Sequence, residues 1–162
     1  MAIEVQRYLL QEYYGIPGET TVYHYINSGF TKLDEAGGAT VDTVAYIGDK
    51  NSTTSITGYE NNFSYESRYH EGNAVCDDLY EIATKQKVGS DCVRTLVSIN
   101  LSKKRDDSPT SYEARCFNVV VQANPPVGGA KSNVTMSGTI HQNGDLVLGT
   151  FDTATKTFTA DQ

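Results

Sequence analysis

The residues able to do acid–base or metal chemistry are scattered along this 162-residue chain. The three histidines, His24, His70 and His141, lack the spacing of metal ligands. Asp77 and Asp78 are adjacent carboxylates, but they fall where the first turns of a helix are expected and would there interact favourably with the helix dipole. No nucleophile elbow, phosphate-binding loop, dinucleotide fingerprint or HExxH motif occurs. The residues therefore predict no enzyme, no metal site and no cofactor.

Composition narrows the class of protein further. The formal net charge of -7 argues against ordinary nucleic-acid binding, which needs a basic face to neutralise phosphates. No apolar run approaches the roughly 20 residues that span a bilayer, and residues 1–5 do not begin a signal peptide. Three cysteines without CxxC spacing are expected to be small buried side chains. Residues 1–162 are expected to form a single domain made in the cytosol.

Residues 44–87 are expected to form the central part of the fold. They contain, in order, an apolar strand end, an exposed turn, a β-prone run and a helix. Asn73 stands at the N-cap position of that helix, and Gly89 is expected as its C′ residue. Apolar residues at spacings of four and three define its buried face: Val75, Leu79 and Ile82. The pattern predicts one amphipathic helix packed on a sheet.

The N-terminal half is expected to contain an arm and a loop. Residues 1–18 mix apolar and charged side chains and are expected as an N-terminal arm that packs on a neighbour. Residues 34–43 are small and polar around Gly37 and Gly38, which predicts a loop leading into a strand at residues 44–47.

The C-terminal half shows clearer strand patterns. Residues 93–101 alternate between apolar and polar types, which predicts a strand with one buried face paired with residues 112–123. The charged residues 102–111 between them are expected to project from the body. Asn143-Gly144 predicts a tight hairpin joining 133–142 to 145–151. The expected fold class is mainly β: an antiparallel β-sandwich or barrel with one α-helix packed on it.

Several segments, taken in their order and spacing, resemble a known family. They are GFTKL at 29–33, AYIGDK at 45–50, ITGY at 56–59 with Phe63, the single helix, GTFD at 149–152 and KTFT at 156–159. Together they resemble the tail tube (major tail) proteins of long-tailed bacteriophages across nearly the whole chain.

The resemblance implies a structural protein of the virion tail, assembled in the host bacterial cytoplasm. Its subunits would form hexameric rings whose inner sheets join into one barrel, and the rings would stack into the conduit for DNA ejection. Expected partners are other copies of the chain, a tape-measure protein, and tail terminator and distal tail proteins. DNA would pass through the lumen without specific binding, and an acidic lumen would repel its phosphates.

Two sets of residues are candidates for these roles. The strand and turn carboxylates proposed to face the lumen are Glu60, Glu66, Glu113 and Asp145. The candidate ring-stacking loop contains Lys103, Lys104, Arg105, Asp106 and Asp107, and residues 1–14 and 34–43 are expected to contribute further ring contacts. For each carboxylate, a solvated position on the outer surface is the alternative.

Other functions fit parts of the same pattern. The inner tube of a contractile tail or phage-derived bacteriocin has a related fold and is the main alternative. A carbohydrate-binding or adhesive β-sandwich would share the acidic charge and the 11 tyrosines, but the chain has no tryptophan, on which sugars often stack. Such a module would be a monomer, whereas a tube protein would oligomerise.

Overall fold

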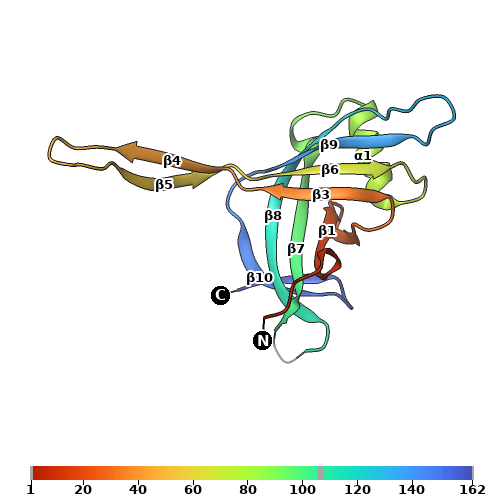
Figure 1. Ribbon diagram of the computed structural model, residues 1–162. Helices are drawn as coiled ribbons and strands as arrows, with labels where there is room; N and C mark the ends of the chain where they lie inside the picture. The colour runs from red at the N-terminus through yellow and green to blue at the C-terminus, as the bar shows by residue number, and fades with distance from the viewer. Residues whose placement is uncertain (1, 106–107, 162) are drawn as a thin grey trace.

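A single curved antiparallel sheet forms most of the protein in the computed structural model, which describes residues 2–105 and 108–161 (Figure 1). Its strands follow the order β2-β1-β7-β8-β9-β6-β3, with β10 and β11 attached beside β8. A separate two-stranded sheet, β4-β5, extends away from this body. The mainly β fold with one α-helix packed on it is therefore confirmed.

The elements have the following bounds. The N-terminal ones are η1 (Arg7–Leu9), β1 (Leu10–Ile16), β2 (Val22–Tyr25), β3 (Phe30–Ala36), β4 (Ala39–Val44), β5 (Thr53–Tyr59) and β6 (Asn62–Arg68). The remaining ones are α1 (Ala74–Thr84), η2 (Gly89–Cys92), β7 (Val93–Lys104), β8 (Ser111–Ala123), β9 (Thr135–Gln142), β10 (Val147–Asp152) and β11 (Thr157–Ala160).

The long strand β8 divides the sheet into two parts. Its first half, residues 111–116, pairs with β10, and its second half, residues 119–123, pairs with β9. The strand β7 pairs along the other edge of β8. Both β9 and β10 pair with β8, and they do not pair with each other. The Asn143-Gly144 turn therefore connects two parts of the sheet, and the prediction of a tight hairpin between β9 and β10 is wrong.

The helix α1 packs over the larger of two core clusters. The Asn73 side chain accepts hydrogen bonds from the backbone N–H groups of Val75 (3.0 Å) and Cys76 (3.3 Å), which confirms the predicted N-cap. The predicted apolar face is buried among β3, β6, β8 and β9. The C′ residue is Gln86, at φ 49°, instead of Gly89, because the Lys87 N–H already bonds the Ile82 carbonyl and ends the helix.

A second, smaller cluster fills the curl formed by β1, β2, β7, β8 and β10. Tyr13 packs against Phe151 with ring centroids 4.5 Å apart, and Tyr23 meets Phe151 edge-on at 5.7 Å. The contact between Tyr23 and Phe151 joins β2 to β10, the first and last strands of this curl. Because β7 lies between both clusters, Leu96 is buried on one side and Val97 on the other, so the expectation of a single buried face for this strand is wrong.

Three N-terminal segments differ from the sequence expectations. Residues 10–16, expected within an arm, form β1, an inner strand paired with both β2 and β7 and anchored by the buried Tyr13 and Tyr14. Residues 34–43, expected as a loop, lie mostly in β3 and β4, with only Gly37 and Gly38 between the strands. Residues 44–47 are the exposed end of the β4–β5 hairpin instead of a core strand.

Candidate functional site

Six exposed large apolar side chains lie on the β4–β5 hairpin and its tip: Val41, Val44, Tyr46, Ile47, Ile56 and Tyr59. Its strands pair with each other from Ala39↔Tyr59 to Val44↔Thr53, and in the described residues they pair with no other strand. Val41 and Ile56 are cross-strand neighbours and are 56% and 59% exposed. A two-stranded hairpin with no third strand or helix against it is marginally stable in water. Within the described residues the hairpin therefore lacks the packing that would stabilise it.

The base of the hairpin is held by a tight crossing of backbones. Gly38 lies so close to Glu60 that a Cβ atom on Gly38 would stand 2.3 Å from the Glu60 carbonyl oxygen. The Glu60 N–H donates to the Gly38 carbonyl at 2.7 Å, and the Gly38 N–H donates to Asn61 Oδ1 at 3.2 Å. Asn61 Nδ2 also donates to Glu35 Oε1 at 3.2 Å. These contacts fix the direction in which the hairpin leaves the sheet.

The hairpin tip is an ordered turn with an apolar end. The Asp49 N–H donates to the Tyr46 carbonyl at 2.9 Å, and Asp49 Oδ2 accepts from the Tyr46 N–H at 3.1 Å. Between them Ile47 is fully exposed to solvent, and Tyr46 is 68% exposed. Two bonds thus hold a turn that presents an isoleucine and a tyrosine.

A polar face covers the outer side of β3, β6 and β9. Alternation places Phe63, Tyr65, Met136 and Ile140 in the core, and their strand neighbours point away from it. The outward side chains, here called the polar sheet face, are Lys32, Asp34, Ser64, Glu66, Arg68, Thr135, Ser137, Thr139 and His141. Small hydroxyl side chains and charges of both signs alternate on this surface.

The four candidate lumen-facing carboxylates fall into two places. Glu66 lies on the polar sheet face, where its residue is the register partner of Lys32. Glu60 and Asp145 line one cleft at the hairpin end of that face, together with His141. Glu113 lies elsewhere, on the face of β8 that carries Phe117; its side chain is 43% exposed and 4.0 Å from Lys103. His141 belongs both to this cleft and to the polar sheet face, so three of the four carboxylates lie on or beside that face.

The candidate ring-stacking loop begins at the end of β7. Lys103 and Lys104 are the last residues of that strand and are exposed. Arg105 donates from Nη1 to both carboxylate oxygens of Asp161 at 2.9 Å, which ties this loop to the chain's C-terminal end. Asp106 and Asp107 lie outside the described residues.

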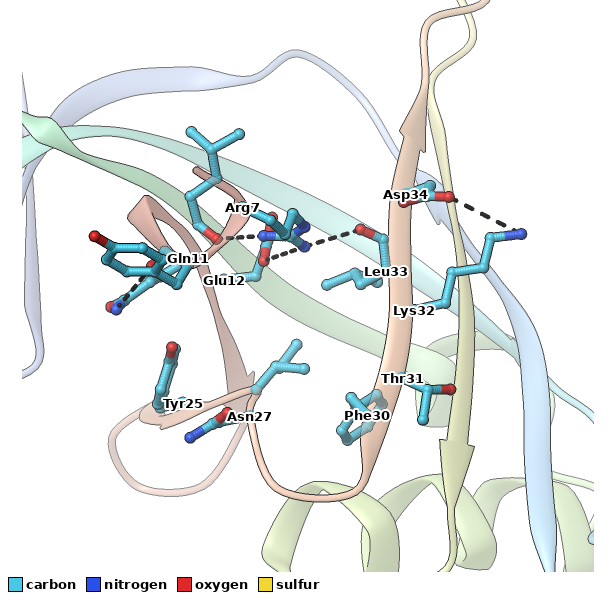
Figure 2. Close-up of a pocket in the computed structure, with 13 residues that line it drawn as sticks. Arg7, Gln11, Glu12, Tyr25, Asn27, Phe30, Thr31, Lys32, Leu33 and Asp34 are labelled. Atoms are coloured by element: carbon cyan, nitrogen blue, oxygen red, sulfur yellow. Dashed lines mark hydrogen bonds and ion pairs between the residues drawn. The ribbon is translucent and has the colours of Figure 1, made fainter. Parts of the chain in front are cut away.

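A groove opens between η1, β1 and β3 (Figure 2). Arg7 spans it by donating to Glu12 Oε2 at 3.2 Å, to the Leu33 carbonyl at 3.1 Å and to the Leu10 carbonyl. Burial raises the pKa of Glu12, and the attraction of the Arg7 guanidinium opposes that shift without cancelling it. The strand β3 pairs only with β6 within the described residues, so its other edge faces this groove.

Asp78 has a structural role that the sequence did not indicate. Its carboxylate accepts from Arg94 Nε at 2.9 Å and Nη2 at 3.1 Å, and from the Tyr14 hydroxyl at 2.6 Å. Arg94 is only 7% exposed. Burial, with Asp78 beside it, raises the pKa of Tyr14 well above its ordinary value. These partners lie 16 and 64 residues from Asp78, so no local pattern could have revealed them.

The described residues contain no group of three or more histidine, cysteine or acidic side chains arranged to hold a metal ion. Across residues 2–105 and 108–161, no helix is long and apolar enough to cross a membrane. Cys76 and Cys92 are buried as expected, and Cys116 is half-buried.

The fold of this chain resembles that of chains in solved structures, although no family model matches its sequence. No protein-family model and no curated protein matches the sequence. Among solved structures, the chain is similar to a chain in the tail of an empty gene transfer agent particle with C6 symmetry, with a TM-score of 0.62 and 10% identity over 97% of this chain and 100% of that one.

A chain of the native gene transfer agent virion gives a TM-score of 0.60 at 10% identity, with the same coverage. A chain of the anti-feeding prophage baseplate gives 0.53 at 9% identity, over 91% of this chain and 97% of that one. At such identities the likeness concerns the fold. The protein has the fold of chains found in tail particles and contractile injection systems, which confirms at that level the resemblance seen in the sequence.

Proposed function

We propose that the protein is a tail tube subunit that assembles into hexameric rings, which stack into the conduit for DNA. The observation that carries this proposal is the β4–β5 hairpin, which exposes apolar side chains at its tip and on its strands and pairs with no other strand among the described residues. Burying one such valine or isoleucine side chain contributes about 1.5–3 kcal/mol. Contact with further copies would supply the stabilisation that an isolated hairpin lacks.

The open edges of the sheet support the same proposal. Both β2 and β3 have only one strand partner among the described residues. Unpaired strand edges are templates for pairing with another chain. Repeated head-to-tail contacts between copies close into rings when the rotation permits. In this role the protein is structural and needs no catalytic group.

We place the polar sheet face toward the lumen, with Glu60 and Asp145 at its hairpin end. Its charged residues are Asp34, Glu60, Glu66 and Asp145 against Lys32 and Arg68. Four carboxylates and two cations leave a net charge of -2 per chain, or about 12 negative charges in a ring of six. Within a Debye length of about 8–10 Å, this wall repels phosphates. Hydroxyl side chains between the charges offer no cationic surface to hold DNA.

Charge reversal tests the lumen assignment. The triple variant Glu60→Lys, Glu66→Lys and Asp145→Lys should still form tubes, because isolated exposed charges contribute little to stability. Those tubes should retain short duplex DNA in a sedimentation assay, with retention falling steeply as salt rises. The matched control reverses three exposed carboxylates outside this face, Glu4→Lys, Glu19→Lys and Glu71→Lys, and so changes the net charge equally. Charge-reversed tubes that retain no more DNA than the control would refute the assignment.

Assembly itself is tested by light scattering and negative-stain electron microscopy of the purified protein over a wide concentration range. Six-membered rings or tubes are expected. A strict monomer at every concentration, also with a tape-measure protein and a terminator protein present, would refute the proposal and favour a carbohydrate-binding module. The similarity to the anti-feeding prophage chain keeps the inner tube of a contractile system as the second candidate. Binding of the assembled tube to a sheath protein would favour that candidate.

A further inference from the structure

We propose that Asn143 is a site of spontaneous deamidation, which converts its side-chain amide to a carboxylate. The modification needs no enzyme and no cofactor, and it goes beyond the proposed tube function because it does not depend on assembly. Asparagine is a thermolabile residue type. The residue after it controls the reaction, because the backbone nitrogen of that residue is the nucleophile. Asn143 is the one asparagine of the chain that is followed by glycine.

The reaction passes through a cyclic imide. Hydroxide removes the proton from the Gly144 backbone nitrogen, which attacks Cγ of Asn143 and displaces the side-chain nitrogen. That nitrogen takes a proton from water and leaves as ammonia. Water then opens the imide ring at either carbonyl, which gives aspartate or isoaspartate. One water is consumed and one ammonia is released, with no oxidation or reduction, and each product carries a negative charge that asparagine lacks.

The fold leaves both reacting groups free. Asn143 and Gly144 are exposed and lie in the connection between β9 and β10, outside the registers of both strands (Figure 1). Among the described residues, no group accepts a hydrogen bond from the Gly144 N–H, and none bonds the Asn143 side-chain amide. A backbone N–H in a ladder would be bound to a partner. Here it is open to hydroxide instead.

Glycine at position 144 also leaves room for the ring. Gly144 has φ 86°, which glycine adopts readily, and a Cβ atom there would meet no atom within 4 Å. The Asn143 N–H donates to the Asn118 carbonyl at 2.7 Å, and Gln142 Nε2 donates to the Gly144 carbonyl at 2.8 Å. Neither bond uses the nucleophile or the side-chain amide. The connection is therefore anchored in the fold while its reacting groups stay available.

Other asparagines are held in place or hindered. Both polar side-chain atoms of Asn61 and of Asn73 make hydrogen bonds, which keep the amide carbon from the nitrogen that would attack it. Asn51 is exposed, and no group in the described part of the chain bonds its side chain. It is followed by Ser52, whose side chain obstructs ring closure. Asn51 is therefore the internal reference for the effect of the glycine.

The new charge would lie beside an acidic cleft. Gly144 lines the cleft at the hairpin end of the polar sheet face together with Glu60 and Asp145. A carboxylate at position 143 would add to their negative potential, because charges within a Debye length of about 8–10 Å act together. In the proposed tube, each modified chain would strengthen the repulsion of phosphates at this end of the face.

Peptide mass spectrometry tests the inference. The folded protein is incubated in mildly alkaline buffer, and conversion of each asparagine to aspartate or isoaspartate is followed over time. Conversion at Asn143 should be at least about tenfold faster than at Asn51, a difference of about 1.4 kcal/mol in activation free energy. The rate at Asn143 in the folded protein should lie within a few-fold of the rate in urea. A smaller difference between the two sites, or conversion confined to the unfolded chain, would overturn the inference.

Isoelectric focusing of two variants provides the second measurement. The unmodified protein should acquire an acidic form during incubation that migrates with the variant Asn143→Asp. Asn143→Gln should not acquire it, because glutamine must close a larger ring, whereas the matched control Asn51→Gln should acquire it at the unmodified rate. An acidic form that still appears in Asn143→Gln would contradict the assignment. Neither measurement requires assembly, so a negative result leaves the tube proposal standing.

Discussion

The substitution Gly38→Ala should separate folding from assembly. A Cβ atom at position 38 would stand 2.3 Å from the Glu60 carbonyl oxygen and 2.9 Å from the carbonyl carbon, both of them backbone atoms. The strands at the hairpin base must therefore move apart. That movement breaks the 2.7 Å bond from the Glu60 N–H to the Gly38 carbonyl and the 3.2 Å bond from the Gly38 N–H to Asn61.

The expected magnitude follows from these two bonds. Each hydrogen bond contributes about 0.5–1.5 kcal/mol net, so the native hairpin direction loses about 1–3 kcal/mol. When only the native direction allows assembly, apparent affinity falls with its population, here by about 5- to 150-fold. The two core clusters do not include the hairpin, so the body of the protein should keep its stability.

Pelleting of tubes at increasing protein concentration measures this effect as a critical concentration. Thermal unfolding followed by circular dichroism checks that the body remains folded, with a melting temperature close to that of the unmodified protein. The matched control is Gly58→Ala in the same hairpin, where an added Cβ meets no atom within 4 Å. Equal critical concentrations for the two variants would refute the claim that the base of the hairpin sets its direction.

Three further predictions concern stability under conditions that keep the protein monomeric. Asp78→Asn should lower the free energy of unfolding by about 3–5 kcal/mol in urea titrations, because it leaves the buried Arg94 guanidinium without its counter-charge; a loss below about 1 kcal/mol would show that the pair is dispensable. Burial raises the pKa of Glu12, so the folded protein binds a proton on this carboxyl more tightly than the unfolded chain does. The protonated Glu12 therefore stabilises the folded state at low pH, and this stabilisation is lost as pH rises above 4.5. Relative to the unmodified protein, Glu12→Gln should therefore become more stable as pH rises from 4.5 to neutrality, and a difference that does not vary with pH would contradict this. Asn73→Ala should cost about 1 kcal/mol through loss of the N-cap, whereas an unchanged urea midpoint would contradict the capping role.

Local signals in the sequence predicted the helix well. Asn73 and the spacing of Val75, Leu79 and Ile82 act within a few residues, and tertiary packing agrees with them. The Asn143-Gly144 signal failed because β8 is long enough to pair with β10 and β9 in turn, which leaves those two strands unpaired with each other. Strand partners depend on residues far along the chain, and turn residues alone do not determine them.

The candidate lumen-facing carboxylates stay a prediction, and the structure shows only where they lie. Glu60, Glu66 and Asp145 lie on or beside the polar sheet face, whereas Glu113 lies on β8 near Lys103, away from that face. The projecting hairpin was missed because paired glycines at 37 and 38 suggest a loop, whereas here they let two backbones cross closely. Its β-prone residues fit strands, but nothing local shows that both strands leave the core. The apolar residues at 44–47 favoured a buried strand, because the sequence does not show that this segment lies at the tip of a projecting hairpin.

Cryo-electron microscopy of the assembled protein is the most direct test of the central claim. The reconstruction should show six-membered rings stacked into a tube, with the β4–β5 hairpin of every chain packed on another copy and the polar sheet face toward the lumen. An assembly in which the hairpin stays free in solvent, or in which the helix α1 faces the lumen instead of that face, would contradict the account. Particles that remain single chains at every concentration would contradict it as well.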